Sequence, residues 1–172
     1  MTINLEKVDL NNAFKIAEWK SDPILARMIM SSFKKTSLSK AKKWIIETNS
    51  DKNQKLNGIY YAEDDVKNLI GITRLMYIDW QSKVAELGMY IGDEHYRRRG
   101  LGKIAIAKTL EQGFSNLGLR KIFLKVAEGN RSAVQLYLGN GFEIEGELRQ
   151  HFKTDQSFEN ILIMSKFNPQ KL

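Results

Sequence analysis

The stretch that most constrains this chain is a basic turn with two glycines, Tyr96–Lys103, which reads YRRRGLGK. It follows the apolar run Leu87–Ile91 and opens a helical pattern. Glycine lets the backbone approach a ligand closely and adopt positive φ. The first N–H groups of the new helix lack intrahelical acceptors and lie at the positive end of its dipole. The stretch therefore predicts a strand–turn–helix unit in which an anion, such as a phosphate, meets directed donors and four cationic side chains.

Composition narrows the class of protein. The 172 residues are 42% hydrophobic and 27% charged, so we expect residues 1–172 to form a single domain with a sizeable core. The chain has no apolar run of about 18 residues, and Met1–Glu6 does not resemble a secretory signal, so we expect no membrane association. The absence of cysteine excludes disulfides, thiolate metal ligands and a cysteine nucleophile, and it favours a cytoplasmic protein.

The formal net charge of +7 is unevenly placed. Four cationic residues lie in the basic turn, and a second basic cluster, Lys34–Lys43, is expected to be a solvated helix surface. A focused site for a small polyanion explains this distribution better than a long stripe that follows a nucleic-acid backbone. A nucleic-acid-binding domain is kept as an alternative, and it predicts strongly salt-dependent binding to DNA or RNA.

Hydrophobic periodicity predicts strands and helices in mixed order. The expected strands are 3–8, 56–62, 69–78, 84–91, 121–126, 142–152 and 158–167, and the expected helices follow residues 9, 37, 100 and 131. Asp9 is a plausible N-cap, and the first helix should end near Ser21–Pro23 because the residue before a proline avoids the α region. The polar stretch Thr48–Lys55 is an expected loop. The order predicts an α+β fold with a mixed sheet that contains an antiparallel meander.

Two other phosphate-binding motifs fit less well. A Walker A loop has four residues between its glycines and a Lys-Ser/Thr ending, and both are absent. Gly100–Ala105 matches GxGxxA, but a dinucleotide site also has an acidic residue about 20 positions later, where Leu119–Ile122 has no carboxylate. Too few βα units follow the turn for a doubly wound fold.

Two spaced motifs resemble the GNAT superfamily of acetyl-CoA-dependent N-acetyltransferases. The pattern R/Q-x-x-G-x-G/A is met by Arg97, Gly100 and Gly102. The pattern N-x-x-A-x-x-L-Y-x-x-x-G-F is met by the run from Asn130 to Phe142. The resemblance implies the GNAT fold, a twisted and mostly antiparallel sheet of about six or seven strands flanked by about four helices. It also implies a splay between the fourth and fifth strands.

The resemblance implies acetyl-CoA as a co-substrate that donates the acetyl group. In relatives, backbone amides of the glycine turn hold the CoA pyrophosphate, the preceding strand edge pairs with the pantetheine arm, and the asparagine caps its helix. The residues expected to bind the donor are Met89, Tyr90, Ile91, Arg97, Arg98, Arg99, Gly100, Leu101, Gly102, Lys103, Asn130, Ala133 and Tyr137.

Two residues are expected to be catalytic. Tyr137 matches the family tyrosine near the thioester sulfur, and a phenol with a pKa of about 10 can protonate a departing thiolate at neutral pH. Its alternative role is to anchor its helix in the core. Glu86 matches a glutamate that acts as a base, directly or through water, and its alternative role is structural or substrate-orienting. We expect His95 on the surface, His151 packed or lining a cleft, and no metal site.

The acceptor stays open at this point. Segments of the chain resemble branches that acetylate ribosomal-protein N-termini, polyamines and amino-sugar nucleotides. A polyamine pocket would draw carboxylates from Glu18, Glu86, Glu145 and Glu147, and a nucleotide-sugar pocket would use Arg27, Lys34, Lys35 or Arg74. We therefore predict an acyltransferase that acts on a primary amine in a ternary complex, with a non-catalytic CoA-binding module as an alternative. Homo-oligomers are common among relatives, and the sequence leaves the oligomeric state open.

Overall fold

The protein is built around one seven-stranded sheet with the strand order β1-β2-β3-β4-β5-β7-β6. The structure is a computed structural model that describes residues 2–31, 33–64, 66–154 and 157–170. The strands are β1 (Thr2–Lys7), β2 (Lys55–Glu63), β3 (Val66–Asp79), β4 (Val84–Ile91), β5 (Lys121–Ala127), β6 (Glu143–Lys153) and β7 (Phe158–Phe167). All neighbours pair antiparallel except β4 and β5, which pair parallel. The predicted mixed sheet and its antiparallel meander are confirmed.

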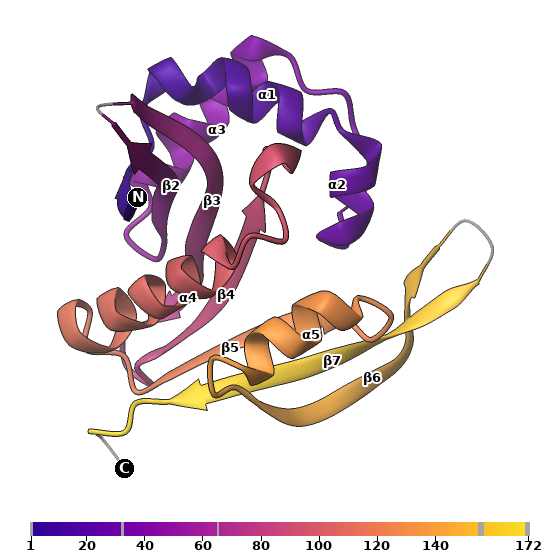
Figure 1. Cartoon of the computed structure of the whole chain (residues 1–172). Helices are drawn as coiled ribbons and strands as arrows, with labels where there is room; N and C mark the ends of the chain where they lie inside the picture. Colours follow the sequence, from indigo (N-terminus) through magenta and orange to yellow (C-terminus); the bar gives the residue numbers. More distant parts are fainter. Residues whose placement is uncertain (1, 32, 65, 155–156, 171–172) are drawn as a thin grey trace.

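Helices lie on both sides of this sheet (Figure 1). Within the described ranges they are α1 (Ala13–Lys20), α2 (Pro23–Met28), α3 (Leu38–Ser50), α4 (Leu101–Glu111) and α5 (Arg131–Leu138). Short 3-10 turns occupy Leu10–Asn12 and Glu94–Tyr96, and a π-helical turn, Gln112–Asn116, continues α4. No helix in the described part of the chain is long and apolar enough to cross a membrane.

One helix more forms than the sequence predicted. Asp9 accepts a hydrogen bond from the N–H of Asn11 and caps the 3-10 turn that leads into α1, so the expected cap is confirmed. Asp22 caps α2 in the same way, and Pro23 occupies its first turn. Proline fits this position because its missing N–H would have no intrahelical acceptor. The proline that was expected only to end the first helix therefore also begins a second.

Helix α3 runs further than expected. The stretch from Thr48 was predicted to be a loop, but the helix continues to Ser50. Ala41, Ile45 and Thr48 are buried at helical spacing, so the apolar stripe extends past the point where the sequence turns polar. The amide of Asn49 also donates to the carbonyl of Val8 at 2.8 Å. Contacts with the rest of the fold thus extend α3 beyond what its local composition predicts.

Strand β4 faces a different set of helices on each side. Leu87 packs in the same buried cluster as Tyr137 of α5. Tyr90 packs against the cluster beneath α1 and α3, and its ring lies edge-on to Trp19 with centroids 5.9 Å apart. Because successive side chains of a strand point to opposite faces, β4 contributes to both layers. This strand positions the site described next.

Candidate active site

Strands β4 and β5 pair only where they begin. Val84–Glu86 pairs with Lys121–Phe123, and both strands then continue without pairing each other. Strand β5 keeps β7 as a partner over its whole length, so the two halves of the sheet diverge (Figure 1). No described strand pairs with the facing edge of β4 over Leu87–Ile91, so its backbone groups there can bind an extended ligand. The predicted splay is confirmed.

The basic turn follows the open end of β4 and leads into α4. Gly100 caps α4 with a left-handed backbone, φ 77°, and Arg98 is also left-handed, with φ 58°. The backbone N–H groups from Arg98 to Gly102 have no hydrogen-bond acceptor among the described residues. A Cβ added at Gly100 would meet nothing within 4 Å. Open donors at the positive end of a helix fit a phosphate group.

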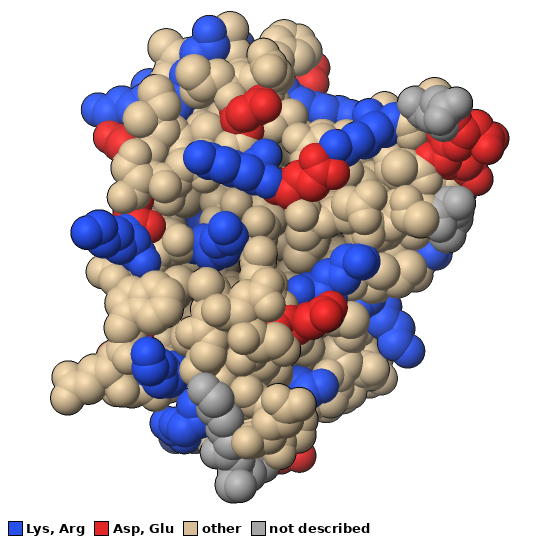
Figure 2. Space-filling view, turned by 90° about the vertical axis from the view of Figure 1, so that its left-hand side faces the viewer, with Lys and Arg blue, Asp and Glu red and all other residues tan. Residues whose placement is uncertain are grey.

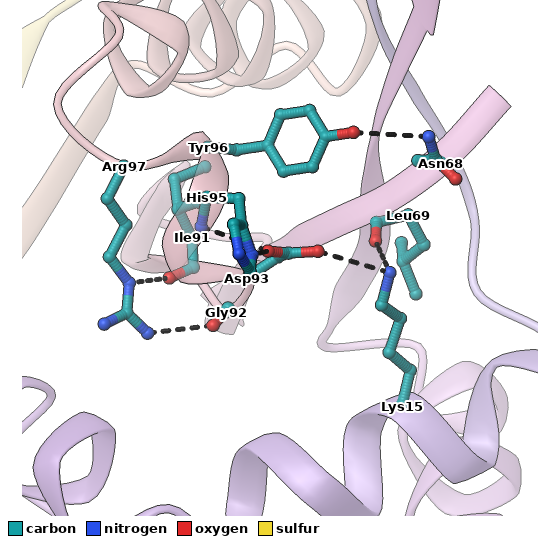
Figure 3. A network of polar contacts seen from close by, with 9 residues as sticks. All are labelled: Lys15, Asn68, Leu69, Ile91, Gly92, Asp93, His95, Tyr96 and Arg97. Carbon is teal, nitrogen blue, oxygen red and sulfur yellow. Dashed lines mark hydrogen bonds and ion pairs between the residues drawn. The ribbon is translucent and has the colours of Figure 1, made fainter. Parts of the chain in front are cut away.

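A polar network fixes this turn to the rest of the protein (Figure 3). Arg97 donates from Nε to the carbonyl of Ile91 at 2.9 Å and from Nη2 to the carbonyl of Gly92 at 2.8 Å. Asp93 lies 3.6 Å from Nζ of Lys15 on α1. The guanidinium of Arg97 therefore positions the turn, and two of its donor atoms are already engaged.

The other cations of the turn remain available to a ligand. The guanidinium of Arg99 lies over the rings of Tyr61 and Tyr96, at 5.8 and 5.7 Å from their centroids. Arg98 and Lys103 are exposed. Within the described residues, none of these three side chains donates a hydrogen bond or forms an ion pair. Three of the four expected cations can thus face an anion, while Arg97 acts mainly through the turn that it holds.

The surface charge of one face of the molecule bears on the nucleic-acid alternative. On the face shown in Figure 2, lysines and arginines are scattered and acidic side chains lie between them. They do not form a continuous stripe on this face, which a protein that tracks a nucleic-acid backbone would need. The charge pattern of this face therefore gives no support to the nucleic-acid alternative.

Tyr137 lies on α5 with its side chain buried. It is 8% exposed, and its ring packs edge-on against Phe142 with centroids 5.7 Å apart. Burial raises the pKa of Tyr137 to about 12, so the phenol stays protonated across the neutral range. It belongs to the same buried cluster as Leu87 of β4 and Val126 of β5, the two strands that diverge. This place suits both the predicted acid and the alternative of a core anchor.

Asn130 joins α5 to α2. Its Oδ1 accepts from the N–H of Ala133 at 3.2 Å and caps α5, as the resemblance implied. Its Nδ2 donates to the carbonyl of Met28, at the end of α2, at 3.4 Å. One side chain therefore ties the helix that carries Tyr137 to α2, which lies far from it in the sequence.

Glu86 lies on the opposite face of β4 from Tyr137. Strand alternation gives it the face of Gly88 and Tyr90, away from Leu87. Its carboxylate is 14% exposed, and Oε2 lies 3.4 Å from Nζ of Lys125 on β5. The two residues expected to be catalytic thus flank β4 from its two sides rather than lying next to each other.

The two histidines lie on the surface. The side chain of His95 is 82% exposed, and its Nδ1 lies 3.1 Å from Oδ1 of Asp93, in agreement with the predicted surface role. His151 is exposed on β6, so the expectation that it is packed or lines a cleft was wrong. The pairing of β6 with β7 is irregular between Leu148 and Phe152, where Gln150 has a left-handed backbone, and His151 lies in this exposed bulge. The described residues include no group of three or more His, Asp or Glu that could hold a metal.

A pocket of ≈ 480 Å³ lies on the side of β4 that faces α1, α2 and α3. Strand β4 contributes Gly88, Met89 and Tyr90 to it, next to the split. Its cationic lining consists of Lys20, Lys34 and Arg74. Sequence reasoning named Lys34 and Arg74 as cations for an anionic acceptor but missed Lys20. The only signal for Lys20 was its place next to a tryptophan at the end of α1.

Comparison with known proteins identifies the family. Residues 3–143 match the family model described as an acetyltransferase (GNAT) domain. The chain belongs to the GNAT acetyltransferase family. It is 34% identical over 112 residues to a spermidine N(1)-acetyltransferase of Vibrio cholerae, over 63% of this chain and 64% of that relative. It is 32% identical over 102 residues to the Escherichia coli spermidine N(1)-acetyltransferase, over 59% and 54%. The matches span less than two thirds of each of these curated relatives.

A solved GNAT structure confirms the fold. The crystal structure of spermidine N-acetyltransferase from Vibrio cholerae in complex with CoA and spermine matches with a TM-score of 0.90. The match covers 98% of this chain and 96% of that chain, at 23% sequence identity. The GNAT fold expected from the two motifs is therefore present, with seven strands and, in the described ranges, five α-helices where about four were expected.

Proposed function

We propose that this chain transfers the acetyl group of acetyl-CoA to a primary amine. The observation that carries the proposal is the row of N–H groups from Arg98 to Gly102, which have no acceptor among the described residues and follow the split edge of β4. The turn supplies donors for a pyrophosphate, and the edge of β4 supplies alternating N–H and C=O groups for an amide-containing arm. Both lie inside the segment that matches the GNAT family model.

We assign the binding of acetyl-CoA to the edge of β4, the basic turn and the start of α5. The residues that would hold it are Met89, Tyr90, Ile91, Arg97, Arg98, Arg99, Gly100, Leu101, Gly102, Lys103, Asn130, Ala133 and Tyr137. A Cβ at Gly102 would lie 3.3 Å from Leu136 and 3.3 Å from Met89, so the start of α4 lies close to α5 and β4. The small residue keeps these three elements together around the split.

Residues on the two faces of β4 carry out different proton transfers in the proposed reaction. The bound thioester supplies a carbonyl carbon that the neutral amine attacks, so that a C–N bond forms and the C–S bond breaks. Backbone N–H groups at the edge of β4 stabilise the negative charge that develops on the carbonyl oxygen. Tyr137 donates its O–H proton to the departing sulfur. Glu86, directly or through a water, accepts the proton that the nitrogen loses, and the enzyme forms no covalent bond.

The acceptor class rests on the relatives and on the pocket. Two relatives are named spermidine N(1)-acetyltransferases, which supports a small amine as the acceptor. The pocket lies beside Gly88 and Met89 of β4, so an amine bound there reaches the split. Polyamines, amino-sugar nucleotides and peptide N-termini are the classes to be compared.

The test is release of the CoA thiol from acetyl-CoA, followed with a thiol reagent, over spermidine, spermine, aminoglycosides, amino-sugar nucleotides and short peptides. Calorimetry on the same protein measures acetyl-CoA binding. We expect binding together with thiol release for at least one acceptor. Binding without release from any acceptor would favour a CoA-binding module that lacks catalysis. Absence of acetyl-CoA binding to the folded protein would overturn the proposal.

A further inference from the structure

Two cations share one aromatic ring in the pocket on the α1–α3 side of β4. Nζ of Lys20 lies 3.5 Å from the ring centroid of Trp44, and the guanidinium carbon of Arg74 lies 5.9 Å from it. Lys20 ends α1, Trp44 belongs to α3 and Arg74 to β3, so three separate elements bring these groups together. The aromatic ring offers each cation a favourable face but does not neutralise its charge.

The positive charge of this pocket is only partly compensated, because Glu86, on the same face of the sheet, interacts electrostatically with Arg74 without forming an ion pair with it. Lys20, Lys34 and Arg74 line it, and none of the described lining residues is an Asp or Glu. No carboxylate among the described residues forms an ion pair with any of these three cations. Burial, with the nearby charge of Arg74, lowers the pKa of Lys20 to about 8. Two like charges in a partly buried place cost free energy unless an anion joins them.

A hydroxyl without a partner lies in the same pocket. The Oη of Tyr90 is buried and has no hydrogen-bond partner among the described residues. Tyr90 lines the pocket and interacts electrostatically with Arg74. Buried polar groups in native proteins are usually hydrogen-bonded, so an orphan hydroxyl beside a cation is a place for a ligand oxygen.

The carboxylates that a polyamine would need are not among the residues that line the pocket. Glu18 is exposed on α1. Glu86 lies on the pocket's face of β4 and interacts electrostatically with Arg74, but its ion pair is with Lys125. Glu145 pairs with Lys121, and Glu147 accepts from the amide of Asn160. None of these four glutamates lines the pocket. A polyamine placed there would add ammonium groups to three existing cations, and like charges repel strongly in partly buried surroundings.

We infer that the acceptor is a primary amine that also carries an anionic group, a phosphate or a carboxylate, and that Lys20 and Arg74 bind this group. The inference rests on the acetyltransferase activity proposed above. The anionic end lies against Lys20 and Arg74, with the Tyr90 hydroxyl as a further donor. The amine end reaches Gly88 and Met89, where β4 opens toward the donor. The acceptor class thus differs from that of the spermidine-named relatives.

The kinetic test compares acceptors that differ only in the anion. The pairs are glucosamine 6-phosphate with glucosamine, and a dipeptide with its C-terminal amide, and spermidine is the cationic reference. We expect kcat/KM at least ten-fold higher for the anionic member of one pair than for its neutral twin. A preference within the first pair identifies a phosphate, and a preference within the second identifies a carboxylate. Spermidine as the best acceptor would overturn the inference.

Substitutions of the pocket cations test where the anionic group of the acceptor binds. Arg74→Met and Lys20→Met each remove one charge, and we expect a ten-fold or larger loss of kcat/KM for the preferred acceptor. Lys42→Met is the matched control, because Lys42 is exposed on α3 and lies outside the pocket. Arg74→Glu should shift preference toward spermidine. Unchanged acceptor kinetics in both Lys20→Met and Arg74→Met would overturn the assignment.

A binding measurement separates this inference from the proposed function. Protein saturated with CoA, which occupies the turn before α4, is titrated with inorganic phosphate and followed by thermal shift. We expect stabilisation of the wild type and Lys42→Met but a loss of the shift in Arg74→Met. If no amine is acetylated and this pattern holds, the anion site stands and the proposed activity fails. If acetylation occurs and phosphate and carboxylate make no difference in any assay, the activity stands and the anion site fails.

Discussion

The two sides of β4 offer different kinds of groups to a charged ligand. On the side of α4 and α5, the donors are consecutive backbone N–H groups from Arg98 to Gly102, and the nearby cations are mostly exposed. On the side of α1 and α3, the cations are the half-buried Lys20 and Arg74, brought together by elements distant in sequence. The N–H groups from Arg98 to Gly102 are positioned by the local conformation of the turn. Lys20 and Arg74 are instead brought together by the packing of helices and the register of the sheet. Backbone N–H groups suit a ligand that all members of a family bind, whereas side chains such as Lys20 and Arg74 can differ between members.

The largest effect should come from the chemistry on the α5 side. We expect Tyr137→Phe to lower kcat by about 100-fold or more, the range for loss of a general acid, while the Kd for acetyl-CoA changes little. Stopped-flow or steady-state thiol release gives kcat, and calorimetry gives Kd. Tyr77→Phe, at a position 72% exposed, is the control. Unchanged kcat in Tyr137→Phe would leave Tyr137 as a core anchor only.

A smaller effect should follow from the left-handed glycine of the turn. Gly100→Ala should weaken acetyl-CoA binding by about ten-fold, because the methyl group strains the cap and enters the open donor site. Gly141→Ala is the control for left-handed backbone strain, since its φ of 78° is close to the 77° of Gly100 and it lies after α5, where the added Cβ would meet only the flexible end of Lys166. Both variants should lose about 1 kcal/mol of unfolding free energy. Equal affinity for acetyl-CoA in the two variants would contradict the proposal that the N–H groups from Arg98 to Gly102 bind acetyl-CoA.

Salt should distinguish exposed from half-buried cations. Raising the salt from about 0.05 M to about 0.5 M should weaken acetyl-CoA binding by a few-fold through screening of Arg98 and Lys103. Arg98→Ala should reduce that dependence. The KM of the preferred acceptor should change less, because Lys20 and Arg74 are partly shielded from ions. If the acceptor KM rises more steeply with salt than the acetyl-CoA Kd, the cations of the acceptor pocket are not better shielded from ions than those of the turn.

The smallest expected effect concerns stability and pH. The pKa of Lys20 is about 8 in the folded protein, below its ordinary value of 10.5. The unfolded chain therefore binds more protons between these values, and stability rises with pH across this window. Relative to Lys20→Met, the wild type should gain on the order of 1 kcal/mol, because partial exposure weakens the effect. Denaturant unfolding from pH 7 to 10.5 measures it, and the difference between wild type and Lys42→Met should stay flat.

Local patterns in the sequence predicted one side of β4 well. The turn, the left-handed glycine and the helix that follows are consecutive in the sequence. A short motif therefore contains all of the backbone N–H groups that we propose for acetyl-CoA binding. The strands also emerged from apolar alternation, because each has a buried face. Helix α2 was missed because Pro23 was taken only as a stop signal, although proline also fits the first turn of a helix.

The pocket was less predictable because no local pattern contains it. Arg74 faces α3 only through the register that pairs it with Gly88, and a slip of one residue would turn it to the other face. Lys20 meets Trp44 through the packing of α1 on α3. The sequence could name cations for an anionic acceptor, but it could not show which of them converge. Lys34 and Arg74 line the pocket, while Arg27 and Lys35, named with them, do not.

The double role of Asn130 limits how this protein can tolerate mutation. Its oxygen accepts from Ala133 and its nitrogen donates to the carbonyl of Met28. Aspartate would keep the acceptor and lose the donor, serine would be too short to span both partners, and lysine would keep only a donor. Asparagine alone combines both groups at this length. A substitution at this one position would therefore disturb both the helix of Tyr137 and α2, which forms part of the pocket wall.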